Sequence, residues 1–420
     1  MEDQGRRVTR RTVFHIPGYD PMPPRRYREL YRKEAAKQAR ISGYEIALKA
    51  ENSTDSFSWS VAARVAGDPT LSQIHVLVWS DIVRDSMAQS IPATYWQLAR
   101  TAWLYLSTGT LRRLTWMRKG PVIAALYPVF MLTGQALLAL WLGWTVGRLL
   151  EGALLWLWSF IGFGIAYVTW LAWGLKLATL AVVSAIVLRW FKAVDHRLFA
   201  HYLMHDYAFS AQLRGLTPPP LQSRLDTFRA QIAAALQSDV DEVLIVGHSS
   251  GAHLAVSIMA AMVRAGGVPV KGPKLALLSL GQVIPMVSFL PRAQRLRGDL
   301  VDLAVSDRIT WVDVTAPGDG CCFALCDPVS VTGVAPPGKR WPLVISAAFT
   351  NTLKAATWRA LRWRFFRLHF QYLCAFDRPG DYDYFQITAG PLFLADRFAG
   401  RRPSGARIDI PVSKYTSLPA

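Results

Sequence analysis

One apolar segment constrains this chain more than any other feature. Residues 121–188 contain only three formally charged side chains, Arg148, Glu151 and Lys176. A membrane-spanning helix needs about 20 mostly apolar residues, which is more than the core helix of a soluble protein usually has. We therefore predict two spans, at about 121–147 and 152–176, joined by a turn that contains Arg148 and Glu151. Residues 177–188 are expected to continue as a helix at the membrane interface or against the soluble domain.

The predicted hairpin divides the rest of the chain into two parts. Residues 120–190 form the insert, 1–119 and 191–400 form the two parts of a soluble domain, and 401–420 form a tail expected to be loosely ordered. Two spans return the chain to its starting side, so both soluble parts can share one site. Arginine and lysine flank the pair of spans, which favours a cytoplasmic soluble domain by the positive-inside rule. The alternative is a buried helical hairpin in a soluble protein.

The composition agrees with membrane association. Hydrophobic residues make up 52% of the chain, which has 16 tryptophans and a formal net charge of +18. A basic surface suits a membrane with anionic lipid on its cytoplasmic side. Nucleic acid is not expected as a partner, because the arginines are scattered and form no recognition module. The charged N-terminus lacks the apolar core of a signal peptide.

The four cysteines do not form a spaced framework. Three of them crowd into one short segment and no Cys-x-x-Cys pair occurs: Cys321, Cys322, Cys326 and Cys374. We interpret them as small buried side chains and expect neither a metal nor a cofactor.

The sequence VLIVGHSSGAHLAVSIMAAMV contains the pattern Gly-x-Ser-x-Gly at Gly247, Ser249 and Gly251. A short β-branched run precedes it, and apolar residues at helical spacing follow. This context predicts a nucleophile elbow, in which a sharp strand-to-helix turn presents the serine at the end of the strand. The alternative is an ordinary Gly/Ser turn between two core elements.

Strand-like segments alternate with helix-sized ones along both soluble parts. Strands are expected at 12–16, 44–48, 57–65, 74–79, 243–246, 275–280 and 309–314, with helices at 26–40, 221–236, after 251 and at 352–364. Such alternation predicts an α/β fold with a mostly parallel sheet covered by helices on both faces.

A nucleophilic serine needs a histidine to take its proton and an acid to orient that histidine. With a nucleophile elbow of the α/β-hydrolase type, the acid and then the histidine follow the serine along the chain. This order points to His369, because His253 lies on the elbow helix and the other six histidines come earlier or within the motif. Asp319 follows a predicted strand and is the favoured acid. Asp327 is the alternative acid, and Asp313, within the strand, is a weaker candidate.

The charge that develops on the substrate oxygen needs backbone N–H donors. Ser250, directly after the predicted nucleophile, would supply the first donor. The loop His15–Asp20 would supply the second, from Tyr19 or else from Gly18, since Pro17 has no N–H. The alternative is that this loop is simply a turn.

Two other groups of polar residues are assigned no chemistry. His201 and His205 stand four residues apart but lack the His-Glu-x-x-His pattern of a zinc site, so we expect helix contacts. Asp381 and Asp383 are expected on one face of a strand, without a catalytic partner.

Taken together, Ser249, Asp319, His369 and the Gly18 loop resemble the α/β-hydrolase superfamily, in particular lipases and esterases. The resemblance covers the soluble parts and departs from the family at Ile16-Pro17, where a His-Gly-rich loop is usual. A membrane hairpin before the elbow is also atypical and resembles a membrane-bound subgroup.

The resemblance implies a serine hydrolase that cleaves an acyl ester or thioester. Its substrate would be a membrane lipid or another small acyl compound. The contrasting hypothesis is a non-catalytic membrane protein whose hydrolase-like domain binds a ligand.

Overall fold

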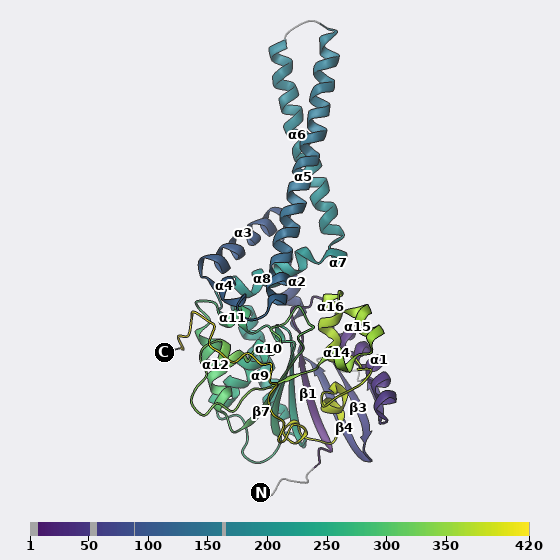
Figure 1. Cartoon of the computed structure of the whole chain (residues 1–420), viewed down its shortest axis with the longest axis vertical. Coiled ribbons are helices and arrows are strands. Elements are labelled where there is room, and N and C mark those ends of the chain that lie inside the picture. The colour runs from purple at the N-terminus through teal and green to yellow at the C-terminus, as the bar shows by residue number, and fades with distance from the viewer. Residues whose placement is uncertain (1–6, 51–56, 88, 162–164, 420) are drawn as a thin grey trace. The chain divides into compact units, whose positions relative to one another are not determined.

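The computed structural model describes residues 7–50, 57–87, 89–161 and 165–419, and it centres on one mixed eight-stranded sheet (Figure 1). The strand order is β2-β3-β4-β1-β5-β6-β7-β8. The strands are β1 (Arg10–Ile16), β2 (Glu45–Ala50), β3 (Phe57–Val65), β4 (Asp68–Val76), β5 (Glu242–His248), β6 (Lys274–Leu280), β7 (Ile309–Thr315) and β8 (Leu343–Ser346). β3 is antiparallel to both of its neighbours, and the strands from β4 to β8 pair in parallel. The expectation of a mostly parallel α/β sheet is thus confirmed at this coarse level.

The predicted strands match the sheet except at two places. β4 begins at Asp68 and ends at Val76, so the prediction of 74–79 starts too late and runs past its end. The first residues of β4 alternate exposed and buried side chains, and this weak pattern was missed. β8 was not predicted, because its four residues LVIS are too short to show a period.

Alternate residues of the parallel strands face two different helical layers. Leu244 and Val246 of β5 belong to a buried cluster that also contains side chains of α1 (Arg25–Ser42) and α17 (Tyr384–Ala389). α10 (Gly251–Arg264) contacts β1, β5 and β6 but contributes nothing to that cluster, so it covers the other face. This two-sided burial explains why β5 reads as a continuous apolar run.

The remaining elements are mostly short. They are α2 (Ser80–Met87), α3 (Ile91–Ser107), α4 (Thr110–Leu114), α5 (Lys119–Ser159), α6 (Ile165–Ala193), α7 (Asp195–Leu198), α8 (Ala200–Ala211), α9 (Pro219–Ala235), α11 (Pro285–Ser288), α12 (Gln294–Val305), α13 (Pro328–Val331), α14 (Phe349–Thr352), α15 (Ala355–Leu361), α16 (Phe365–His369), a 3-10 turn η1 (Phe370–Leu373) and α18 (Leu394–Arg397). The helix predicted at 352–364 is shorter in the structure: Thr352 ends α14, Leu353 and Lys354 separate the two helices, and α15 covers only Ala355–Leu361.

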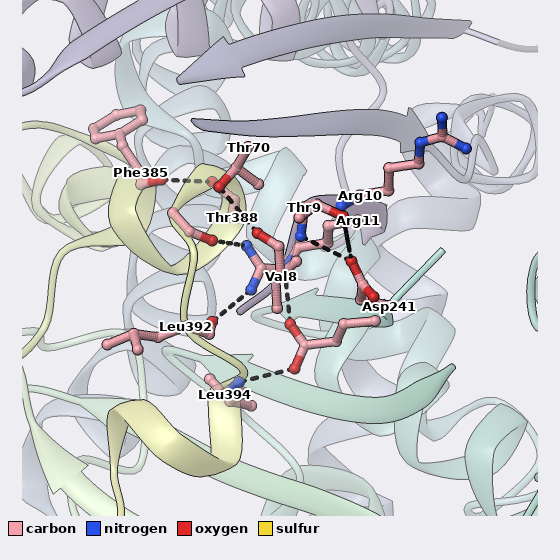
Figure 2. Close-up of polar contacts among 12 residues, drawn as sticks. Val8, Thr9, Arg10, Arg11, Thr70, Asp241, Phe385, Thr388, Leu392 and Leu394 are labelled. Atoms are coloured by element: carbon pink, nitrogen blue, oxygen red, sulfur yellow. Dashed lines mark hydrogen bonds and ion pairs between the residues drawn. The ribbon is translucent and has the colours of Figure 1, made fainter. Parts of the chain in front are cut away.

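A buried ion pair ties the start of β1 to the start of β5. The Arg11 guanidinium donates to Glu242 Oε2 at 2.7 Å, and both side chains are fully buried. It also donates to the carbonyl oxygens of Gly390 and Leu392, while Leu394 N–H donates to Glu242 Oε1 (Figure 2). Three backbone segments distant in sequence, at Arg11, at Glu242 and at residues 390–394, thus meet at one charge pair.

The chain divides into two compact units. One unit comprises residues 1–85, 104–123 and 210–420 and contains the sheet; the other comprises 86–103 and 124–209 and contains most of α5 and α6. The predicted boundaries at 119 and 191 therefore differ from those found. The Tyr95 hydroxyl donates to the carbonyl oxygen of Leu132 in α5, and the Tyr127 hydroxyl of α5 donates to that of Leu198, so segments on both sides of the long helices contact them.

The two long helices differ from the predicted spans. α5 runs unbroken from Lys119 to Ser159, so Arg148 and Glu151 lie within a helix and not in a turn. α6 runs through Lys176 to Ala193, so no separate interfacial helix begins there. Residues 162–164, inside the predicted second span, lie outside the described residues. A run of apolar residues does not indicate where one helix ends and the next begins. The charged residues Arg148 and Glu151 were therefore wrongly interpreted as the turn between the two helices.

Both helices are long and apolar enough to cross a membrane. In their most apolar windows only 28% and 17% of the residues are buried, which is unlike the core helices of a soluble protein. The two helices pack closely where Gly143 and Gly147 leave room for the α6 backbone: a Cβ at Gly147 would lie 2.9 Å from the carbonyl oxygen of Lys176. Here Lys176 Nζ pairs with Glu151 at 3.1 Å, between the rings of Trp144 and Trp173.

The C-terminal tail is not loosely ordered as predicted. Ile408 pairs with Cys326 as an isolated β-bridge, and Val412 is buried and donates its N–H to the carbonyl oxygen of Val331. The proline-rich tail thus follows the protein surface as an extended strap, except for Ala420, which lies outside the described residues. Asp383 also differs from the prediction of a strand, because it caps the N-terminus of α17 through the N–H groups of Phe385 and Gln386.

Candidate active site

Ser249 has a strained backbone, as the predicted nucleophile elbow requires. Its φ is +57°, in the left-handed region that non-glycine residues rarely adopt. It sits between the end of β5 and the start of α10, as the Gly-x-Ser-x-Gly pattern predicts, and its side chain is partly exposed. Strain of this kind costs of order 1–3 kcal/mol and concentrates at functional sites.

The two glycines of the motif are needed on steric grounds. A Cβ at Gly247 would lie 2.8 Å from the Cα of Ala252 in the first turn of α10. A Cβ at Gly251 would lie 2.1 Å from the carbonyl oxygen of Ile16 and 2.6 Å from that of Pro17. The second glycine therefore lets the His15–Asp20 loop approach the elbow, which joins two segments that the sequence separates by more than 200 residues.

His369 and Asp319 meet as a buried pair. His369 Nδ1 lies 2.7 Å from Asp319 Oδ2, and both side chains are buried. When Nδ1 carries the proton of this bond, Nε2 of the neutral ring is left to accept a proton. Asp319 lies in the loop directly after β7, and His369 ends α16.

Asp319 is held as a carboxylate by several donors. Its Oδ2 also accepts from the Tyr372 hydroxyl at 3.0 Å, and its Oδ1 accepts from the Cys321 N–H at 2.9 Å. Burial alone would raise the pKa of Asp319, but the charge and hydrogen bond of His369 and the Cys321 N–H together lower the pKa below its usual value. This carboxylate can therefore orient His369 and stabilise its charged form.

Tyr372 was missed in the sequence. Its hydroxyl donates to Asp319 and accepts the Ala316 N–H at 2.9 Å, so it fixes the acid relative to the end of β7. Burial and the nearby Asp319 charge raise the pKa of Tyr372 well above its usual value, which keeps it a donor. The signal was its position three residues after His369, on the same side of a helical turn.

His369 packs beside the residues that flank Ser249. Ser249 N–H donates to the carbonyl oxygen of Leu280, and Gly281 follows with a φ of +53°. A Cβ at Gly281 would lie 2.9 Å from His369 Cε1, so only glycine admits the ring here. The ring centroid of His248, directly before Ser249, lies 4.8 Å from that of His369. His248 Nε2 also forms a hydrogen bond of 3.0 Å with the backbone carbonyl oxygen of His369. Burial, reinforced by His369, lowers the pKa of His248 well below its usual value, so His248 is neutral.

The structure brings the predicted oxyanion loop to the serine. A Cβ at Gly18 would lie 2.9 Å from Ser249 Cβ and 3.4 Å from its Oγ. Trp79 Nε1 donates to the Pro17 carbonyl oxygen at 3.0 Å and fixes the loop. Tyr19 is buried with its ring against Trp79, and Ser250 is buried at the start of α10. The Gly18 backbone thus lies against Ser249. The choice of Tyr19, or else Gly18, as the second N–H donor stays a prediction.

The two other acids have different roles. Asp327 caps α13 through the N–H groups of Val329 and Ser330 and pairs with Lys339 Nζ at 2.5 Å. Asp313 is buried within β7, where its Oδ1 lies 2.6 Å from the Ser279 hydroxyl. Burial raises the pKa of Asp313 to about 8, so it is protonated at neutral pH. His369 contacts neither acid in the hydrogen bonds and ion pairs of the described residues.

Three side chains here could hold a cation. One ligand atom each from Asp319, Cys321 and His369 lies within 4.8 Å of the others. The carboxylate and imidazole are already bonded to each other, so a metal would have to replace the proton between them. The arrangement fits a histidine–acid pair, and the four cysteines are free thiols of which Cys322 and Cys326 are buried.

The second histidine pair has local partners. His205 Nδ1 lies 3.0 Å from Gln97 Oε1, and His201 Nδ1 lies 3.4 Å from Asp195 Oδ1. Both rings are buried in the unit that contains the long helices. Among the described residues, these two histidines form no group with a third ligand.

Comparisons of the chain with known protein families, with curated proteins and with solved structures give no match. The site is therefore interpreted from its own geometry.

Proposed function

We propose that this chain is a membrane-anchored serine hydrolase with an α/β-hydrolase-like fold. The observation that carries the proposal is the meeting of the strained Ser249 turn and the His369–Asp319 pair around Gly281. The parallel strands β1, β5, β6 and β7 support the fold, because their carboxyl ends carry the Gly18 loop, Ser249, Gly281 and Asp319. A turn with no chemical role would need neither the strain nor the buried acid.

The proposed chemistry is acyl transfer through the serine. His369 Nε2 takes the proton of Ser249 Oγ as the oxygen attacks the carbonyl carbon of an ester or thioester. The backbone N–H groups of Ser250 and of Gly18 or Tyr19 stabilise the oxyanion. His369 then protonates the departing alkoxide or thiolate, and a water molecule, activated in the same way, releases the acid. No cofactor is required.

The proposed location follows from the two long helices. As two membrane spans, α5 and α6 would hold the sheet domain at one surface of the bilayer, which gives a lipid or lipid-linked acyl substrate direct access. Arginine and lysine outside the spans favour the cytoplasmic side. Protease added to one side of sealed vesicles of known orientation would test this placement through cleavage of the soluble parts.

Labelling by a fluorophosphonate probe tests the hydrolase proposal. The full chain in detergent should be labelled, Ser249→Ala should abolish labelling, and the exposed Ser238→Ala should leave it unchanged. His369→Ala should slow labelling by a factor of about 10²–10⁴, the usual contribution of a general base. Absence of labelling, or undiminished labelling of Ser249→Ala, would favour a non-catalytic ligand-binding domain.

A further inference from the structure

The segment that carries His369 also carries an exposed group of cationic and aromatic side chains. Trp363 is 72% exposed and Phe365 is 48% exposed, at the junction of α15 and α16. Arg362, Arg364 and Arg367 are exposed beside them, and no carboxylate among the described residues pairs with these three. The Arg362 guanidinium lies 5.5 Å from the centre of the Trp363 ring. An exposed tryptophan beside arginines without a carboxylate partner is unusual on a water-facing surface, because it leaves apolar area and positive charge in water.

A second group of the same kind precedes α5. Trp116 is 52% exposed, and the guanidinium of Arg113 lies 4.4 Å from the centre of its ring, with that of Arg112 at 5.7 Å. Lys119, three residues later, begins α5. If the N-terminal part of α5 enters a bilayer, Trp116 and these arginines lie close to the bilayer surface.

Both groups flank the loop that carries Asp319. A Cβ at Gly120, in the first turn of α5, would lie 2.9 Å from the Cα of Gly320, and a Cβ at Gly320 would lie 3.3 Å from the Phe365 ring. Arg118 donates to the carbonyl oxygens of Ala324 and Ala406, which fastens the start of α5 to the end of this loop. The two exposed groups therefore border one region beside the candidate acid.

We infer that these two groups form one docking surface for anionic phospholipid. We define the basic-aromatic rim as Arg112, Arg113, Trp116, Arg362, Trp363, Arg364, Phe365 and Arg367. Arginine binds phosphate through paired N–H groups, and tryptophan favours the interface between headgroups and acyl chains. The continuity of the rim with α5 makes a bilayer its partner, and its charge selects anionic lipid.

The inference deepens the proposed function and rests on it for the substrate. With the rim on the headgroups, the site would draw an acyl ester from the bilayer itself and not from water. Because the long helices already hold the chain to the vesicle, the rim changes how the sheet domain meets the surface and not how much protein is bound.

Tryptophan fluorescence tests docking without any need for catalysis. The full-length Ser249→Ala variant is placed in vesicles of phosphatidylcholine with about 30% phosphatidylserine, with and without brominated acyl chains. The difference between this protein and the same protein with Trp363→Phe isolates one tryptophan from the others. Trp363 should be quenched in the anionic vesicles and less so in phosphatidylcholine alone. Equal emission of Trp363 with and without bromine would overturn the inference.

Charge reversal tests the consequence for activity. In anionic vesicles, Arg362→Glu/Arg364→Glu should lower hydrolysis of an ester held in the bilayer at least about fivefold, since one arginine near such a surface contributes about that factor. Fluorophosphonate labelling should stay unchanged. The matched control Lys271→Glu/Arg402→Glu makes the same charge change at exposed positions before β6 and near the start of β8, at the other end of the strands.

The outcomes separate the two proposals. Equal rates for the reversed and control variants on the bilayer ester would overturn the docking surface while leaving the hydrolase in place. If the wild type showed no labelling that depends on Ser249, the hydrolase proposal would be refuted. Quenching of Trp363 would still support docking in that case. If the rate loss were the same in vesicles of neutral lipid, the effect would not come from anionic headgroups and the inference would fail.

Discussion

Replacing Arg11 by methionine should destabilise the sheet domain by about 3–5 kcal/mol, the usual cost of removing one partner from a buried ion pair. The structure explains the size of this loss. Arg11 makes three hydrogen bonds of 2.6–2.7 Å, to Glu242 and to the carbonyl oxygens of Gly390 and Leu392. After the change, the fully buried Glu242 carboxylate would keep only the Leu394 N–H as a hydrogen-bond partner among the residues that the structure describes.

A double variant separates the buried charge from the lost packing. Arg11→Met/Glu242→Gln removes both charges and keeps an amide oxygen that can accept from the Leu394 N–H. We expect it to be more stable than Arg11→Met alone, with a coupling energy of about 1–3 kcal/mol in the double-mutant cycle. The neighbouring residue provides a matched control, because Arg10 pairs with Asp239 at the surface, where the two side chains are 59% and 95% exposed. Arg10→Met should cost at most about 1 kcal/mol.

Urea unfolding in one fixed detergent, followed by the near-ultraviolet signal of the buried aromatic rings, measures these differences. If detergent holds α5 and α6, their internal backbone hydrogen bonds resist urea, and the change in signal then reports on the sheet domain. Equal losses for Arg11→Met and Arg10→Met would refute the reasoning, and so would a coupling energy below about 0.5 kcal/mol, because residues without a shared partner behave in that way.

Two further predictions concern the candidate site and its supporting strand. Tyr372→Phe removes one donor to Asp319, so the pKa of Asp319 should rise. The loss of probe labelling in acid should then begin at a higher pH. A pH profile of the labelling rate would show this shift, and an unchanged profile would contradict it. Asp313→Asn should stabilise the protein at pH 7–8, because burial raises the pKa of Asp313 to about 8. The wild-type aspartate contributes most stability below its unfolded pKa of about 4, and this contribution is lost as the pH rises toward the folded pKa. The stability gained by Asp313→Asn should therefore vanish near pH 4. Urea titrations at several pH values would measure it.

The sequence was most informative where side-chain pattern and local geometry agree. β5 begins at Glu242 and includes Gly247 of the motif, and the apolar run between these two residues allowed the position of the strand to be predicted closely. Ser249 was predicted on a turn because glycine at both flanking positions serves a steric need. His369 and Asp319 were chosen by chain order and by position after a strand, and the structure places them in contact.

The parts that could not be predicted depend on contacts between distant segments. Nothing in the sequence near Arg11 shows that its partner is Glu242, and nothing near Gly281 shows that a histidine ring will fill the space of its missing side chain. The hairpin turn was misplaced for a related reason. Glu151 was interpreted as a polar turn residue, whereas its charge is matched by Lys176 on the other helix. The sequence alone does not show that a charged residue of one helix is paired with a charged residue of another.

That pair bears on how the protein could be made. Glu151 leaves the ribosome 25 residues before Lys176, because the two positions are 151 and 176. A lone acidic or basic residue near the centre of an inserting helix costs about 2.5–3.5 kcal/mol, so neither helix enters a bilayer as easily alone as with its partner. If α5 and α6 cross a membrane, their ion pair therefore favours entry of the two helices together over entry of α5 alone. The order in which the two helices insert during synthesis, and not only the finished fold, would then depend on the ion pair between Glu151 and Lys176.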